Sequence, residues 1–97
     1  MKSVLISYGQ SLNQAIEELL DKLEIRGFTR WDETQGRGSV DGEPHYGTHA
    51  WPTKNSTIIS IMEDEKATLL LQKLRLMNEQ TEQQGLNAFV WNVEEKL

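Results

Sequence analysis

The sequence predicts an α+β fold in which a four-stranded antiparallel sheet carries two helices on one face. Stretches rich in β-branched and aromatic residues alternate with two stretches whose apolar residues recur at helical spacing. Their order is strand, helix, strand, strand, helix, strand. A chain of 97 residues has room for one modest core, so we expect residues 1–97 to form a single domain.

The first half of the chain contains two predicted strands and one helix. Residues 2–8 include a nearly continuous apolar run, which is typical of a central strand. Ser11 and Gln14 have the spacing of a capping box and predict a helix start. The helix stripe comprises Leu12, Ala15, Ile16, Leu19, Leu20 and Leu23. Gly27 is expected to end the turn that follows, and residues 28–31 alternate as a second strand.

The second half of the chain, after a long loop, contains two more predicted strands and the second helix. Residues 57–62 form the third predicted strand, and Asp64 is a candidate cap for the next helix. The second helix stripe comprises Ala67, Leu70, Leu71, Leu74 and Met77. Gly85 is suited to a left-handed stop, and residues 86–93 form the fourth strand.

This element order is the ferredoxin-like βαββαβ arrangement, whose sheet has one face free of helices. Trp31, Phe89 and Trp91 make that free face too apolar to be left in water. Self-association would cover it. Alternatively, the long loop or residues 94–97 would cover one or two of these aromatic side chains.

The segment from residue 36 to residue 52 holds both histidines, both prolines and four of the seven glycines. Such a composition excludes an ordinary helix or central strand and predicts a long shaped loop, at about residues 35–55. Long loops inside compact domains are usually either functional or disordered, and the polar and aromatic groups in this one favour function. The candidate ligand-binding residues are Gly36, Arg37, Gly38, His45, His49 and Trp51.

Each candidate also has a structural alternative. Arg37, between two glycines, offers a planar cation for a carboxylate or phosphate. It could equally pair with one of four nearby acidic residues, which are Asp32, Glu33, Asp41 and Glu43. Trp51 could stack on a ligand or anchor the return of the chain into the third strand.

His45 and His49 are the candidate metal ligands, with Asp41 and Glu43 as nearby oxygen donors. In an extended chain, residues four apart are separated by roughly 13 Å, so one chain could chelate a metal only if the loop folds back. Hydrogen bonds that shape the loop are the alternative role for the histidines. A histidine here would also respond to pH near 7.

Composition excludes several classes of protein. The absence of cysteine rules out disulfides and thiolate metal sites and fits a cytoplasmic protein. A net charge of −5 opposes binding to nucleic acid. No apolar stretch has the roughly 20 residues of a membrane span, and the start of the chain lacks the features of a signal peptide.

The full chain resembles the PII-like signal-transduction proteins, the group around nitrogen-regulatory PII and CutA. The resemblance rests on the element order and on a loop of the form GRG, GEPH, GTH, WP, found here at residues 36–38, 42–45, 47–49 and 51–52. It implies a homotrimer whose sheets face inward, with a small molecule or anion bound in clefts between subunits. It also implies a non-enzymatic regulator whose loop reports to a partner, such as a regulated protein or a transporter. No particular cofactor follows from the sequence.

Two departures set limits on the resemblance. Nucleotide-binding PII proteins hold phosphates with a basic turn before the last strand and arginines after it, but this chain has residues 78–84 (NEQTEQQ) and then Glu94 and Glu95. The usual ATP site is therefore expected to be absent or altered. The alternatives are a CutA-like protein that binds divalent metal and, further off, a small ferredoxin-like enzyme that uses His45 or His49.

Overall fold

The computed structural model describes residues 1–35, 54–80 and 85–97. Its elements are β1 (Lys2–Gly9), the 3-10 helix η1 (Gln10–Leu12), α1 (Asn13–Lys22), β2 (Thr29–Thr34), β3 (Asn55–Met62), α2 (Asp64–Gln80) and β4 (Asn87–Asn92). The sheet order is β2-β3-β1-β4, and all three pairs of neighbouring strands are antiparallel. The predicted ferredoxin-like fold is confirmed. β2 and β3 both extend further toward the loop than expected.

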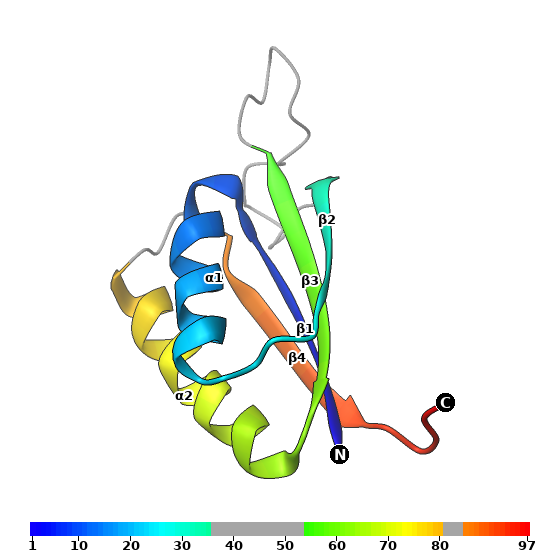
Figure 1. Ribbon diagram of the computed structural model, residues 1–97. Helices are drawn as coiled ribbons and strands as arrows, with labels where there is room; N and C mark the ends of the chain where they lie inside the picture. Colours follow the sequence, from blue (N-terminus) through cyan, green and yellow to red (C-terminus); the bar gives the residue numbers. More distant parts are fainter. Residues whose placement is uncertain (36–53, 81–84) are drawn as a thin grey trace.

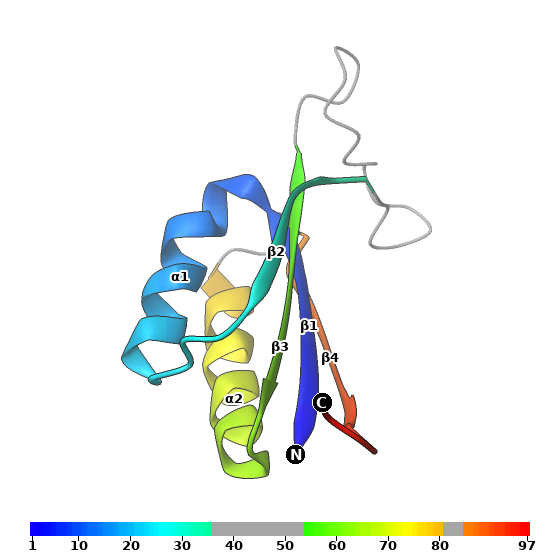
Figure 2. The same ribbon diagram turned by 45° about the vertical axis from the view of Figure 1, so that its right-hand side comes forward.

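Both helices lie on one face of the sheet, as Figures 1 and 2 show from two directions. Alternate residues of β1 and β3 point into the core between the sheet and these helices. The residues buried most completely are Val4, Ile6, Tyr8, Ile16, Leu20, Ile58 and Leu70. Figure 2 shows no described helix on the other side of the sheet, which we call the open face.

The open face is apolar, as the sequence predicts. Phe89 is 60% exposed, Trp31 50% and Trp91 46%, although tryptophan and phenylalanine are normally buried. Register places Ser3 between Ile61 on β3 and Trp91 on β4. The central strand thus presents a small side chain between two large ones. Residues 94–97 are exposed and do not bury these aromatic groups.

The helix starts differ from the prediction. Ser11 does not cap α1, because it lies inside η1, and α1 follows with Leu12 at its N-cap and no side-chain cap. Gln14 instead donates to Glu18 Oε1 at 3.1 Å within the helix. Asp64 is the first residue of α2 rather than its cap, and its carboxylate pairs with the amino group of Met1 at 2.9 Å.

The end of α1 is a Schellman motif that the sequence does not predict. The Ile25 amide donates to the Leu20 carbonyl at 2.8 Å, and the Glu24 amide donates to the Asp21 carbonyl at 3.0 Å. Glu24 therefore occupies the left-handed position with φ 59°. Gly27 lies in the segment between α1 and β2, and its φ is not positive. Gly85 does adopt the left-handed conformation, with φ 64°.

Glu24→Gly is expected to raise the free energy of unfolding by about 0.5–1 kcal/mol, because glycine takes a positive φ without a Cβ clash. Glu24→Ala is the control, since it removes the same carboxylate and keeps the Cβ. Urea denaturation of both variants measures the difference. Equal stability of the two would show that backbone conformation at this position costs nothing.

Candidate ligand site at the base of the loop

The candidate ligand-binding residues chosen from the sequence lie outside the described residues. They are Gly36, Arg37, Gly38, His45, His49 and Trp51. The described residues at the two ends of this segment form a polar cluster, which we call the loop base. It is built on the ends of three strands, because Gly9 of β1 and Thr34 of β2 both align with Asn55 of β3.

A register irregularity at the end of β2 shapes the loop base. Trp31 aligns with Thr57 and Thr34 with Asn55, so the intervening residues of β2 shift out of regular pairing with β3. The hydroxyl groups of Thr34 and Thr57 lie 3.0 Å apart and form a hydrogen bond across the two strands.

Side chains satisfy the backbone of the shifted residues. The Asp32 carbonyl accepts hydrogen bonds from the Gln10 amide side chain and from Ser56 Oγ, the latter at 3.1 Å. The Gln10 backbone amide also donates to the Lys54 carbonyl at 2.8 Å. Gln10 thus ties η1 to both sides of the loop base, which fixes where the chain leaves β2 and where it enters β3.

Ion pairs surround this hydrogen-bonded core. Arg30 on β2 pairs with Glu17 on α1, and its Nε lies 2.7 Å from Asp32 Oδ1. Lys54 Nζ lies 3.1 Å from Glu33 Oε1, which joins the residues flanking the loop. Such partly exposed pairs each contribute about 0–1 kcal/mol. Both basic groups described in the cluster, Arg30 and Lys54, thus already have carboxylate partners. An added anion would have to compete with these carboxylates.

The Tyr8 side chain is fully buried beside this cluster, and its hydroxyl has no hydrogen-bond partner within the described parts of the chain. Burial raises the pKa of the Tyr8 phenol above its usual value of about 10, and the nearby Arg30 guanidinium partly opposes the rise. The neutral phenol is thus the form that the folded chain favours.

This raised pKa predicts a loss of stability in alkali. The unfolded chain gives up the phenolic proton at lower pH than the folded chain, so the stabilisation is complete below about pH 10 and declines as the pH rises further. Tyr8→Phe should reduce the drop in unfolding free energy between about pH 8 and about pH 11 relative to the wild type, as measured by urea denaturation at each pH. An identical drop in the two proteins would contradict the prediction.

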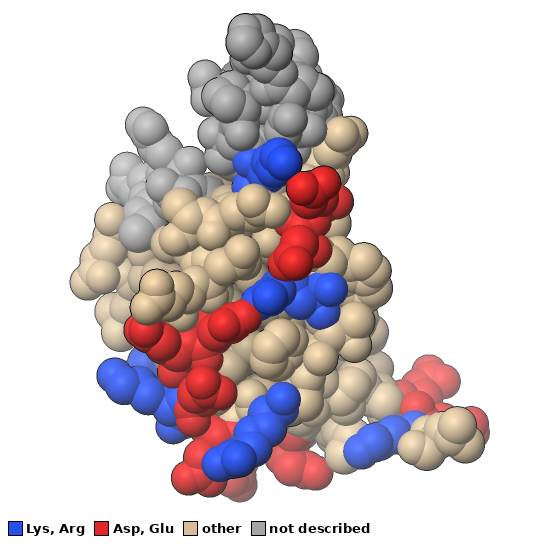
Figure 3. All heavy atoms as spheres, turned by 45° about the horizontal axis from the view of Figure 1, so that its top comes forward, with Lys and Arg blue, Asp and Glu red and all other residues tan. Residues whose placement is uncertain are grey.

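The segments on either side of β4, where the sequence lacks a basic turn and arginines, are only partly described. Asn78, Glu79 and Gln80 are the exposed last residues of α2, while residues 81–84 lie outside the described ranges. Glu94 and Glu95 follow β4 and are exposed. Figure 3 shows basic and acidic side chains alternating on the face it presents, without a continuous basic patch.

The described residues contain no cluster of three or more His, Asp or Glu side chains that could hold a metal ion. His45 and His49, the candidate metal ligands, are not among them. No helix within the described ranges is long and apolar enough to span a membrane.

The chain is similar to known proteins in its three-dimensional structure. No protein-family model matches the sequence. No curated protein matches it either. Among solved structures, CPII from Thiomonas intermedia K12, a nitrogen regulatory PII-like protein bound to ADP, AMP and bicarbonate, has a TM-score of 0.77 and 20% identity over 95% of this chain and 84% of its own. The apo form of CPII gives a TM-score of 0.71 at 17% identity, over 95% of this chain and 87% of its own.

A putative PII-like signaling protein from Thermus thermophilus is 27% identical, with a TM-score of 0.66 over 95% of this chain and 85% of that protein. The chain thus has a ferredoxin-like fold of the kind that signal-transduction proteins use. More narrowly, its fold is that of the PII-like proteins across nearly its whole length. The resemblance predicted from the sequence is confirmed for the fold.

Proposed function

We propose that this protein is a non-enzymatic PII-like regulator that assembles as a homotrimer, binds a small anionic ligand between subunits and signals through residues 36–52. The observation that carries the proposal is the open apolar face on a fold of the PII-like type. A monomer would leave Trp31, Phe89 and Trp91 in water at a cost of about 25 cal/mol per Å² of apolar surface.

The shape of the open face supports assembly. Ser3 on the central strand is 2% exposed, and its hydroxyl has no partner among the described residues. It lies in register between the larger Ile61 and Trp91. The Ser3 hydroxyl is already enclosed by its own chain, so a second copy would pack over the large side chains that flank it, Ile61 and Trp91.

The solved structures suggest the class of ligand. CPII is described as bound to ADP, AMP and bicarbonate, and in another structure to ADP, AMP and acetate. Since Arg30 and Lys54 are engaged by carboxylates, Arg37 becomes the candidate cation for such an anion. Acidic residues after β4 disfavour a triphosphate, so ATP is expected to bind weakly.

Calorimetry with bicarbonate, AMP, ADP and ATP tests the proposal. We expect binding of bicarbonate or of the less charged nucleotides, and a loss of at least tenfold in affinity for Arg37→Ala and His49→Ala with an unchanged thermal midpoint. Arg26→Ala is the control, because Arg26 is exposed, carries the same charge and lies before β2.

Four outcomes would overturn the proposal or part of it. Saturable binding of a divalent metal that needs His45 and His49 would favour the CutA-like alternative, and turnover of any tested compound would favour an enzyme. Submicromolar affinity for ATP would show that other cations replace the missing basic turn. Unfolding of Arg37→Ala or His49→Ala would make that residue structural.

A further inference from the structure

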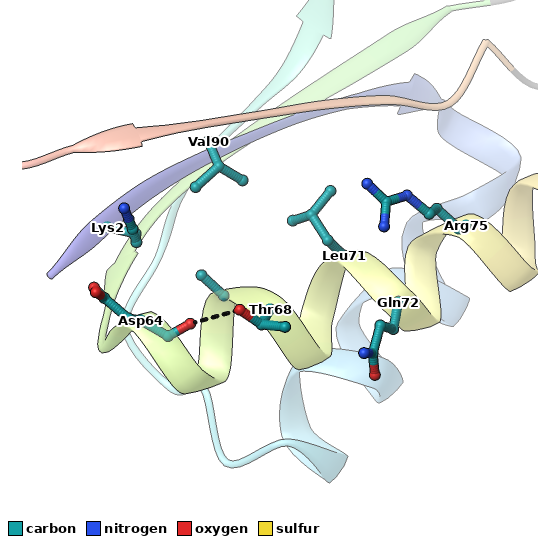
Figure 4. A pocket seen from close by; sticks show the side chains of 8 residues that line it. Lys2, Asp64, Thr68, Leu71, Gln72, Arg75 and Val90 are labelled. Atoms are coloured by element: carbon teal, nitrogen blue, oxygen red, sulfur yellow. Dashed lines mark hydrogen bonds between the residues drawn. The ribbon is translucent and has the colours of Figure 1, made fainter.

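A groove opens between α2 and the edge strand β4, close to the Lys2 end of β1 and away from the loop base at the Gly9 end. Its volume is about 410 Å³, within the range of small-molecule sites. Figure 4 shows the side chains that line it, which come from α2, from Lys2 on β1 and from Val90 on β4. Nothing in the proposed function uses this region.

The floor of the groove is apolar. Val90 aligns with Val4, yet Val90 is 40% exposed while Val4 is 0% exposed, because α2 covers the central strand and leaves the edge strand open. Ala67, 3% exposed, and the partly buried Leu71 complete the floor on the α2 side. An alkyl chain laid along this strip would bury apolar surface on both elements.

The charged groups at the two ends of the groove differ in whether they have partners. At one end Asp64 is paired with the Met1 amino group at 2.9 Å, and Lys2 Nζ donates to Asn92 Oδ1 at 2.6 Å. At the other end the Arg75 guanidinium turns toward Leu71 in Figure 4. No carboxylate of residues 1–35, 54–80 or 85–97 pairs with it. The groove thus joins an apolar floor to a cation that no carboxylate of the described ranges pairs with, in a chain whose net charge is −5.

We propose that this groove binds an organic monocarboxylate with an unbranched alkyl chain. The guanidinium fork of Arg75 holds the carboxylate through two parallel hydrogen bonds, and the alkyl chain lies over Leu71 and Val90. A hydrated inorganic anion would gain the ion pair but not the burial, and an uncharged alcohol would gain the burial but not the ion pair. The combination selects an amphipathic acid.

The test uses butanoate, hexanoate and octanoate at concentrations below micelle formation, followed by NMR shifts of backbone amides in α2 and β4. Affinity should rise about three- to fourfold for each methylene that enters the groove. Octanol should bind at least tenfold more weakly than octanoate. Arg75→Gln should weaken octanoate binding at least tenfold, and Arg75→Lys should recover only part of it, because lysine lacks the fork.

Two matched variants separate this site from general charge and from folding. Lys73→Gln removes the same charge from an exposed position of the same helix outside the groove and should leave binding unchanged. Val90→Thr keeps the shape of the side chain, lies at an exposed position and should weaken the longer acids more than butanoate. Because the proposed trimer site involves other residues, bicarbonate or nucleotide binding should persist in Arg75→Gln.

The proposal fails if octanoate causes no shifts at millimolar concentration, if octanol binds as well as octanoate, or if Lys73→Gln weakens binding as much as Arg75→Gln. Shifts of the Ala67 and Thr68 amides that change on dilution without any added acid would assign the groove to a second copy of the chain, which would also overturn it.

Discussion

Trp91→Glu is expected to convert the protein in solution from about three times the 11.1 kDa chain mass to a single chain. Trp91 is 46% exposed on the open face, so a folded monomer can accommodate the change. In the proposed trimer the same carboxylate would be buried without a partner, at a cost of several kcal/mol at each copy of the interface. Light scattering coupled to size exclusion measures the mass, and far-UV circular dichroism confirms that the variant is folded.

Leu76→Glu is the control for this experiment. Leu76 is 54% exposed on α2, on the covered side of the sheet, and its substitution should leave the assembly intact. A wild-type protein that is monomeric at micromolar concentration would contradict the interface argument. A Trp91→Glu protein that keeps its assembled mass would place the interface elsewhere.

Leu70→Ala is expected to lower the free energy of unfolding by about 2–5 kcal/mol, a large part of the stability of a domain this small. Leu70 is 0% exposed at the centre of the contact between α2 and the sheet, so its truncation leaves a cavity. Leu76→Ala makes the same chemical change on an exposed position of the same helix and should change stability by no more than about 0.5 kcal/mol.

Urea denaturation of the two variants gives the comparison directly. Similar losses in both would contradict the packing argument, because alanine is a better helix former than leucine and helix propensity alone would not lower stability.

The fold could be predicted from the sequence because the stripes of apolar residues on α1 and α2 and the apolar runs of β1 and β3 have clear periods. The open face followed from Trp31, Phe89 and Trp91, whose burial the two helices could not provide. These features depend on spacing along the chain, which a sequence displays directly.

The start and end of α1 were harder to predict from the sequence, because local backbone geometry determines them. Ser11 and Gln14 had the right spacing for a cap, but Ser11 lies within η1, and α1 starts at Asn13 with Gln14 already inside it. Nothing in the sequence marks Glu24 as the left-handed end of α1, where tertiary contacts hold it, including burial of Ile25 and a hydrogen bond from Lys66 to the Leu23 carbonyl. Tertiary packing outweighs intrinsic preference at such positions.

The loop base was missed because its contacts join residues distant in sequence. Gln10 and Asp32 are polar residues without a motif, and nothing in their spacing indicates that one binds the other. The extension of β2 to Thr34 also depends on the hydroxyl of Thr57 across the strands. Similarly, the groove near Arg75 exists because α2 leaves an edge strand uncovered, which only the three-dimensional arrangement reveals.

The contacts of Gln10 with Asp32 and Lys54 have a consequence for how such a protein can diversify. They join η1 to the residues on both sides of the junction, so contacts within the described sheet help to hold the strand ends in register. The free-energy cost of closing a flexible loop, which is entropic, rises by only about 0.6 kcal/mol for each doubling of loop length. New recognition sequences of different lengths could therefore be exchanged between Gln35 and Lys54 on an unchanged scaffold, which makes this junction a natural grafting point for engineered sensors.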